Sequence, residues 1–314
     1  MTPLPTANGL PTLDMHVHVG PELLRRRYGP ASLAEEARRE GFGVVMKNHF
    51  QATTGWVSQL RRDDDRVPLV GSVALNFAAG GVDDHGVRAA LSAWKRDVTQ
   101  ADPDPERFVV WMPTLCTEAH LNLFGRRDVP TEWGVDGRYS RYFPAGTGYR
   151  IDAGDPERVA AIDRALAAIR EHDLVLATGH LDRNETVWLV ERAHAAGLRR
   201  IVMTHPLFQA TRQQLDVLVR LWRECGARTE LAFVNIAMDH LRYEDYVAVI
   251  EAVGAEGVVL SSDLGQPFSP AVGDGLRTYF DELRRRGVRD DAIERMAVIN
   301  PHELLFGPAG AAGV

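Results

Sequence analysis

The sequence predicts a (β/α)8 barrel, and three observations lead to this fold class. Eight short apolar runs rich in β-branched residues alternate with eight amphipathic helical patterns along the 314 residues. No glycine-rich phosphate-binding turn follows the first run, which makes a doubly wound open sheet the second choice. Side chains that bind metals or transfer protons stand at the ends of several runs, where a barrel has its mouth.

Each expected element follows from its own pattern. The expected strands are 13–19, 43–49, 68–75, 107–113, 174–180, 200–205, 229–236 and 257–263. The expected helices are 31–40, 54–63, 83–97, 156–171, 184–196, 211–225, 243–253 and 274–286. Asp155 precedes a proline at the start of the fifth helix, and Asn184 is the expected cap of the sixth.

A single domain over residues 1–314 is expected, with its barrel core at about 12–307. A helical extension should end the chain. The longest departure from the repeat is the segment 114–155 after the fourth strand. A connection of this length in a compact domain usually has a function, and its aromatic residues favour a lid over the barrel mouth.

Composition narrows the classes of function. The net charge of −7 and the absence of a basic run argue against nucleic acid as a partner. Cys116 and Cys225 are the only cysteines, which excludes a cysteine metal cluster and fits a reducing compartment. No secretory signal pattern or membrane-length apolar run is present. We therefore expect a cytoplasmic protein with a small-molecule substrate and no membrane partner, and a homo-oligomer is left open.

The first expected strand ends in two histidines one residue apart, His16 and His18. Alternate side chains of a strand point to the same side, so both imidazoles should aim at one place. His180 ends the fifth expected strand, His205 the sixth and Asp263 the eighth. Because the carboxyl ends of parallel barrel strands share one rim, these five side chains predict a divalent-metal site.

At this point the chain resembles the amidohydrolase superfamily of metal-dependent barrel hydrolases. The similarity rests on the residues just named, in this order, and on the Asn300-Pro301 motif with its apolar helix near the end. It implies that Asp263 binds the metal, orients a water molecule and carries its proton to the leaving group. Zn²⁺ is the expected ion, with Mn²⁺, Fe²⁺ and Co²⁺ as alternatives.

Lys47 leaves the number of metal ions open between one and two. In many members of the superfamily a carbamylated lysine from the fourth strand bridges two metals, but here the fourth strand has no lysine. Lys47 instead ends the second strand of a chain that otherwise uses arginine almost throughout. It is interpreted as a carbamate ligand, as a cation that holds or polarises the substrate, or as a partner in a supporting salt bridge.

The sequence gives less information about the substrate than about the metal site. His49, Arg126, Arg138 and Tyr142 are the candidate substrate-binding residues, since all belong to segments at the barrel mouth. Arginines of the first and fourth loops could bind a carboxylate or phosphate, or could be ordinary surface residues.

The hypothesis is a hydrolase that directs a metal-activated water at an amide, lactam, lactone or ester-like bond of a small, anionic or neutral, organic molecule. Asp263, Lys47 and His180 are its candidate catalytic residues, the latter two as stabilisers of the developing oxyanion. The alternatives are a metal-dependent decarboxylase or isomerase, a phosphoesterase, and a barrel that binds metal and ligand without turnover.

Overall fold

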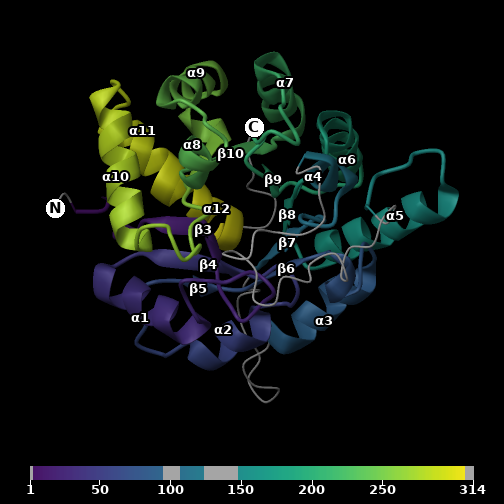
Figure 1. Ribbon diagram of the computed structural model, residues 1–314, viewed down its shortest axis with the longest axis horizontal. Helices are drawn as coiled ribbons and strands as arrows, with labels where there is room; N and C mark the ends of the chain where they lie inside the picture. Colours follow the sequence, from purple (N-terminus) through teal and green to yellow (C-terminus); the bar gives the residue numbers. More distant parts are fainter. Residues whose placement is uncertain (1–2, 95–106, 124–147, 308–314) are drawn as a thin grey trace.

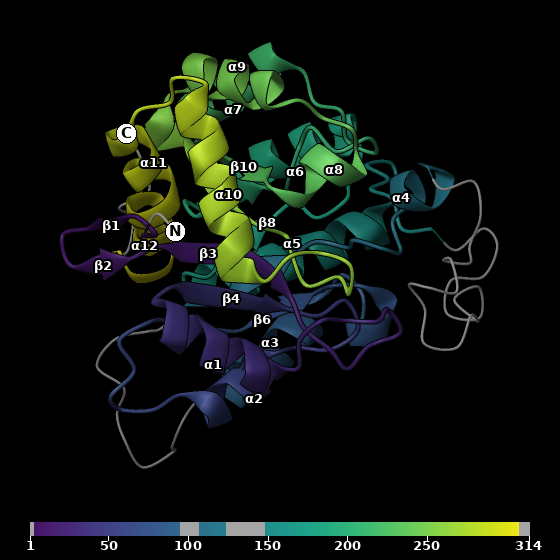
Figure 2. The same cartoon turned by 60° about the vertical axis from the view of Figure 1, so that its left-hand side comes forward.

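The structure, a computed structural model, describes residues 3–94, 107–123 and 148–307. Its centre is a barrel of parallel strands surrounded by helices (Figures 1 and 2). Three strands pair in chain order, namely β3 (Leu13–His18), β4 (Gly43–Lys47) and β5 (Leu69–Val70). Six more follow in chain order, namely β6 (Ser72–Ala74), β7 (Val109–Trp111), β8 (Val175–Ala177), β9 (Ile201–Met203), β10 (Arg228–Ala232) and β11 (Val258–Ser261). Since β5 and β6 are separated by Gly71 alone, they are two halves of one barrel strand, and the predicted fold class is confirmed.

Main-chain hydrogen bonds close the barrel between its last and first strands. The Asp263 amide donates to the carbonyl of His16 at 2.8 Å, and the His18 amide donates to that of Leu264 at 2.7 Å. The buried carboxyl of Asp14 accepts from the Ser262 amide at 3.0 Å and so ties β3 to the end of β11. The closure places the side chains of the first and eighth strands next to each other.

Helices cover the outside of the barrel. They are α1 (Pro30–Glu40), α2 (Thr54–Leu60), α3 (Asp84–Trp94), α5 (Pro156–Glu171), α6 (Arg183–Ala195), α7 (Leu215–Cys225), α9 (Tyr243–Val253) and α10 (Val272–Arg285). The predicted helices are confirmed within a few residues, except that residues 95–97 of the third lie outside the described residues. Several strands end earlier than predicted, because the apolar pattern continues after the chain leaves the ladder. The expected strand 229–236, for example, ends at Ala232 and gives way to α8 (Val234–Met238).

The helix caps give one confirmation and one correction. The Asp155 carboxylate accepts from the amides of Glu157 and Arg158, as predicted. The prediction for Asn184 is wrong, because the Asp182 carboxylate accepts the amides of Asn184 and Glu185 at 2.8 and 2.9 Å. Glu185 in turn accepts the Asp182 amide at 2.8 Å. This reciprocal pair is a capping box, which starts the helix at Arg183.

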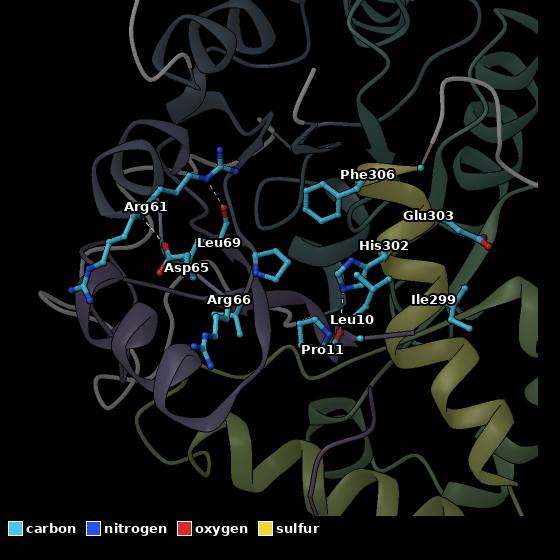
Figure 3. A pocket seen from close by; sticks show the side chains of 15 residues that line it. Leu10, Pro11, Arg61, Asp65, Arg66, Leu69, Ile299, His302, Glu303 and Phe306 are labelled. Carbon is cyan, nitrogen blue, oxygen red and sulfur yellow. Dashed lines mark hydrogen bonds between the residues drawn. The ribbon is translucent and has the colours of Figure 1, made fainter. Parts of the chain in front are cut away.

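The amino ends of the strands are covered by the hairpin of β1 (Thr6–Ala7) and β2 (Leu10–Pro11) and by the predicted helical extension. That extension consists of α11 (Asp290–Glu294), a π-type turn and α12 (Asn300–Phe306). The Asn300 amide group donates to the carbonyls of Ala255 and Val258 at 2.8 and 2.6 Å, which fastens it beneath β11. A pocket of about 620 Å³ lies here between the hairpin, the start of β5 and α12 (Figure 3). It is at the opposite end of the barrel from the histidines described below.

The insertion after the fourth strand begins with the helix α4 (Glu118–Leu123) and returns through residues 148–155. The isolated bridge between Thr117 and Tyr149 holds its two ends together. No helix in the described segments has the length and apolar character needed to traverse a lipid bilayer.

Candidate metal centre

His16, His18 and Asp263 meet at the carboxyl end of the barrel. His16 and His18 are 0% and 4% exposed, and Asp263 is 7% exposed. One carboxylate oxygen of Asp263, Oδ1, lies 3.1 Å from His16 Nε2 and 2.8 Å from His18 Nε2. The alternation of β3 and the closure of the barrel thus bring together three of the predicted ligands.

Glu230 fixes the orientation of His16. Its buried carboxylate lies on β10, and Oε1 is 3.0 Å from His16 Nδ1. Burial opposes ionisation of Glu230, but His16, His205 and the hydroxyl of Ser261 outweigh it and lower its pKa to about 2. An ionised carboxylate only accepts hydrogen bonds, so His16 carries its proton on Nδ1. Its Nε2 lone pair therefore faces Asp263, as in the carboxylate–histidine pairs that support metal ligands.

His205 and His180 extend the cluster around the rim. His205 Nε2 lies 3.9 Å from Asp263 Oδ2, and ligand atoms of His16, His205 and Asp263 lie within 4.8 Å of one another. The His180 ring is 5.0 Å from that of His205, centre to centre. His120 on α4 joins the set, with its Nδ1 2.9 Å from His180 Nδ1.

Four imidazoles of this cluster, namely His18, His120, His180 and His205, are held in the neutral form that binds metals. Burial lowers the pKa of His205 to about 4 and that of His120 to about 3. Burial also places the pKa values of His18 and His180 well below the ordinary range of histidine. Uncharged rings keep a lone pair for a cation at neutral pH.

Lys47 lies inside the cluster. It is 0% exposed, with its Nζ 2.9 Å from His16 Nε2 and 4.7 Å from the centre of the Trp111 ring. Burial is the largest cause that lowers its pKa, to about 8, against the carboxylates of Asp263 and Glu230, which act to raise it. An amine so placed is easily neutralised and reacts more readily than a surface lysine.

His49 lies one layer further out. Its Nδ1 is 2.8 Å from the hydroxyl of Thr114, and its ring centre is 4.6 Å from that of His18. Its main-chain amide donates at 2.8 Å to Glu22, a buried carboxylate of the loop after β3. Ligand atoms of His18, Glu22 and His49 also lie within 4.8 Å of one another.

The backbone is strained at two of these residues. Asp263 and His205 have φ angles of 52° and 23°, in a region that residues other than glycine rarely adopt. Such strain is often found where a side chain must be aimed at a functional site. Gly179, at φ 64°, allows the turn before His180, because a Cβ there would lie 2.4 Å from the carbonyl oxygen of Met112.

The structure brings together His16, His18, Lys47, His180, His205 and Asp263, with His49 beside them. Arg126, Arg138 and Tyr142 lie outside the described residues, and their expected role in substrate binding stays a prediction. Sequence reasoning missed Glu230, Glu22 and the contact of His120 with His180. A signal existed for Glu230, which is the only acidic side chain of the expected strand 229–236.

Comparison with known proteins places the sequence in a family. The model of a family of unknown function, DUF6282, matches residues 11–230. The chain belongs to this family. The matched range covers β3 to the middle of β10 and therefore includes every histidine of the cluster and Glu230, but not Asp263. No curated protein matches the sequence.

Solved structures share the fold of this DUF6282 protein. An amidohydrolase from Pseudomonas aeruginosa matches with a TM-score of 0.55 and 8% identity, over 96% of this chain and 97% of its own. A TatD homologue from Escherichia coli matches at 0.53 and 15%, over 95% and 98%. A dihydroorotase from Campylobacter jejuni matches at 0.52 and 12%, over 94% and 83%. The predicted resemblance to the amidohydrolase superfamily is confirmed in its fold.

Proposed function

We propose that this DUF6282 protein is a metal-dependent hydrolase that cleaves an amide, lactam, lactone or ester-like bond of a small organic molecule. The observation that carries the proposal is the convergence of His16 Nε2 and His18 Nε2 on one oxygen of Asp263, at 3.1 and 2.8 Å. The fold shared with hydrolases such as dihydroorotase supports it.

The residues fit a divalent cation. Glu230 accepts the Nδ1 proton of His16, so Nε2 turns its lone pair toward Asp263, and Lys47 Nζ at 2.9 Å is the positive group beside these two acceptors. A divalent ion would take over that position from the ammonium. His16, His18 and Asp263 would hold the ion, with His205 and His180 as the further ligands. Neutral imidazoles and one carboxylate are the donor set that Zn²⁺ and related ions prefer.

A bound ion of this kind supplies Lewis acidity and lowers the pKa of a coordinated water toward 7. Asp263 accepts the proton of the attacking water and passes it to the leaving group. The oxygen that would take this proton is Oδ2, which lies 3.9 Å from His205 Nε2. In place of a ligand role, His180, whose ring centre lies 5.0 Å from that of His205, would donate to the oxyanion that develops on the substrate. The buried surroundings keep bulk water from competing with these contacts.

Lys47 enters this scheme in one of two forms. Its Nζ approaches the same His16 lone pair that the ion requires, at 2.9 Å. A cation on His16 Nε2 repels an ammonium at that distance, so Lys47 joins the centre either as a carbamate ligand or after swinging toward the substrate as a polarising cation. Lys47→Arg separates the two, because arginine keeps the charge but forms no carbamate. Intact-protein mass spectrometry under native conditions would detect the added mass of one carbon dioxide.

The direct test combines metal analysis with a panel of esters, lactones and amides. Metal-loaded protein should turn over at least one class, with the oxygen of labelled water incorporated into the product. Asp263→Asn should lower kcat by about 100-fold or more while metal remains bound through the histidines. Release of carbon dioxide without labelled oxygen would instead indicate a decarboxylase. Release of phosphate from phosphate esters would indicate a phosphoesterase, and protein that binds metal without any turnover would refute the hydrolase.

A further inference from the structure

The loop between β3 and α1 carries a buried ion pair that the scheme above does not use. The side chain of Glu22 is 0% exposed and that of Arg26 only 5%. Arg26 Nε donates to one carboxylate oxygen of Glu22, and the other oxygen accepts the His49 amide at 2.8 Å. Glu22 therefore fixes the guanidinium against the end of β4.

The loop itself is fastened to the same strand end. The side-chain amide of Asn48 donates to the carbonyls of Val19 and Pro21 at 2.9 and 3.1 Å. The Gly20 amide donates to the carbonyl of Tyr28 at 2.8 Å, which closes the loop on itself. Hydrogen bonds therefore fix both Arg26 and the loop that carries it.

Arg26 donates to the protein through its Nε group. Within residues 3–94, 107–123 and 148–307, its Nη1 and Nη2 groups make no hydrogen bond to protein. Neither nitrogen is among the fully buried atoms without a partner, so both remain accessible to a small molecule. The free nitrogens form the planar fork that binds a carboxylate or a phosphate through two parallel hydrogen bonds.

The Glu22–Arg26 pair lies beside the candidate metal centre. A Glu22 oxygen is within 4.8 Å of ring nitrogens of His18 and His49, and Arg26 contacts that carboxylate directly. A molecule only a few bonds long can therefore reach from the centre to Arg26.

A second metal ion at His18, Glu22 and His49 is the competing interpretation of this cluster. Both oxygens of Glu22 already accept hydrogen bonds, from Arg26 and from the His49 amide. A guanidinium in contact with the carboxylate also repels an incoming cation. The charges favour an anion over a metal at this position.

We propose that Arg26, clamped by Glu22, binds an anionic group of the substrate, so that the enzyme selects small molecules with a carboxylate or phosphate near the scissile carbonyl. This inference rests on the proposed hydrolase for its catalytic meaning. The binding of an anion at Arg26 can be measured without turnover.

The first experiment titrates succinate and inorganic phosphate into the protein by calorimetry. Wild type should bind at least one of them, and Arg26→Gln should weaken that binding by at least about 30-fold, the loss expected when a buried charged partner is removed. Arg26→Lys should restore only part of it, because the fork is lost. Arg277→Gln is the matched control, since Arg277 pairs with Glu40 between α10 and α1, away from the site. Equal affinity in wild type and Arg26→Gln would overturn the proposal.

The second experiment measures kcat/KM for paired esters or lactones with and without a carboxylate. Wild type should prefer the charged member, and Arg26→Gln should lose most of that preference while it still cleaves the neutral one. If wild type cleaves neither, the hydrolase proposal fails, and the calorimetry still decides the role of Arg26. Bound metal per chain should be the same in Glu22→Gln and wild type. A loss of one ion in that variant would identify a cation site and overturn the anion site.

Discussion

Replacement of Glu230 by glutamine tests whether this buried carboxylate sets up the metal centre. Its two oxygens receive three donors, namely His16 Nδ1 at 3.0 Å, the Ser261 hydroxyl at 2.7 Å and the His205 amide at 3.0 Å. A glutamine keeps one acceptor oxygen and turns an amide group toward at least one of these donors. The side chain is 3% exposed, so water cannot repair the mismatch.

The expected cost follows from these contacts. A hydrogen bond to a charged group contributes about 1.5–3 kcal/mol, and an unpaired buried donor costs about 1–3 kcal/mol more. We expect the free energy of unfolding of the metal-free protein to fall by about 3 kcal/mol. With an unfolding entropy of about 2.1 cal/mol/K per residue, a chain of this size should lose roughly 5 °C in Tm. Metal affinity should fall by about 10- to 100-fold, because His16 is no longer held in the tautomer that offers Nε2.

Glu185→Gln provides the matched control. Glu185 is also a buried carboxylate and accepts the amides of Ile151 and Asp182 at 2.6 and 2.8 Å, but it belongs to the cap of α6. Both variants should unfold more easily in calorimetry, and only Glu230→Gln should lose zinc in competition with a fluorescent chelator. A Glu230→Gln protein that binds zinc within twofold of wild type would refute the reasoning.

Three further outcomes are expected. Gly179→Ala should destabilise the protein by more than about 2 kcal/mol in urea unfolding, because its positive φ and the carbonyl of Met112 at 2.4 Å leave no room for a Cβ; near-neutral stability would contradict this. Burial raises the pKa of Asp239 from its ordinary 3.8 to about 6, so ionisation penalises the folded state as the pH rises between those values. Asp239→Asn should therefore gain about 1 kcal/mol over wild type between pH 4 and 6.5 and no more above it, after allowance for partial exposure; a gap independent of pH would exclude the effect. Burial raises the pKa of Cys116 to about 12 and also raises that of Cys225, so neither thiol should react with iodoacetamide in native protein at pH 8. Rapid labelling of either thiol, detected by mass spectrometry, would contradict the closed packing around these cysteines.

The sequence by itself determined the barrel and the positions of its candidate ligands at one rim. The period of apolar residues identifies each strand and helix from its own segment of sequence. His16 and His18 share a face because the side chains of a strand alternate. His180, His205 and Asp263 could be assigned to one rim because parallel strands of a closed barrel end on the same side. These predictions use only neighbours along the chain and one rule of topology.

The tertiary structure alone decided which groups touch. Lys47 reaches His16, Glu230 holds that histidine from β10, and His120 meets His180 from a helix that the apolar pattern did not reveal. The Glu22–Arg26 clamp likewise depends on the fold, because the second oxygen of Glu22 accepts the amide of His49, which follows β4. Hydrogen bonds between residues distant in the chain are set by the packing of whole elements, and no local period encodes them.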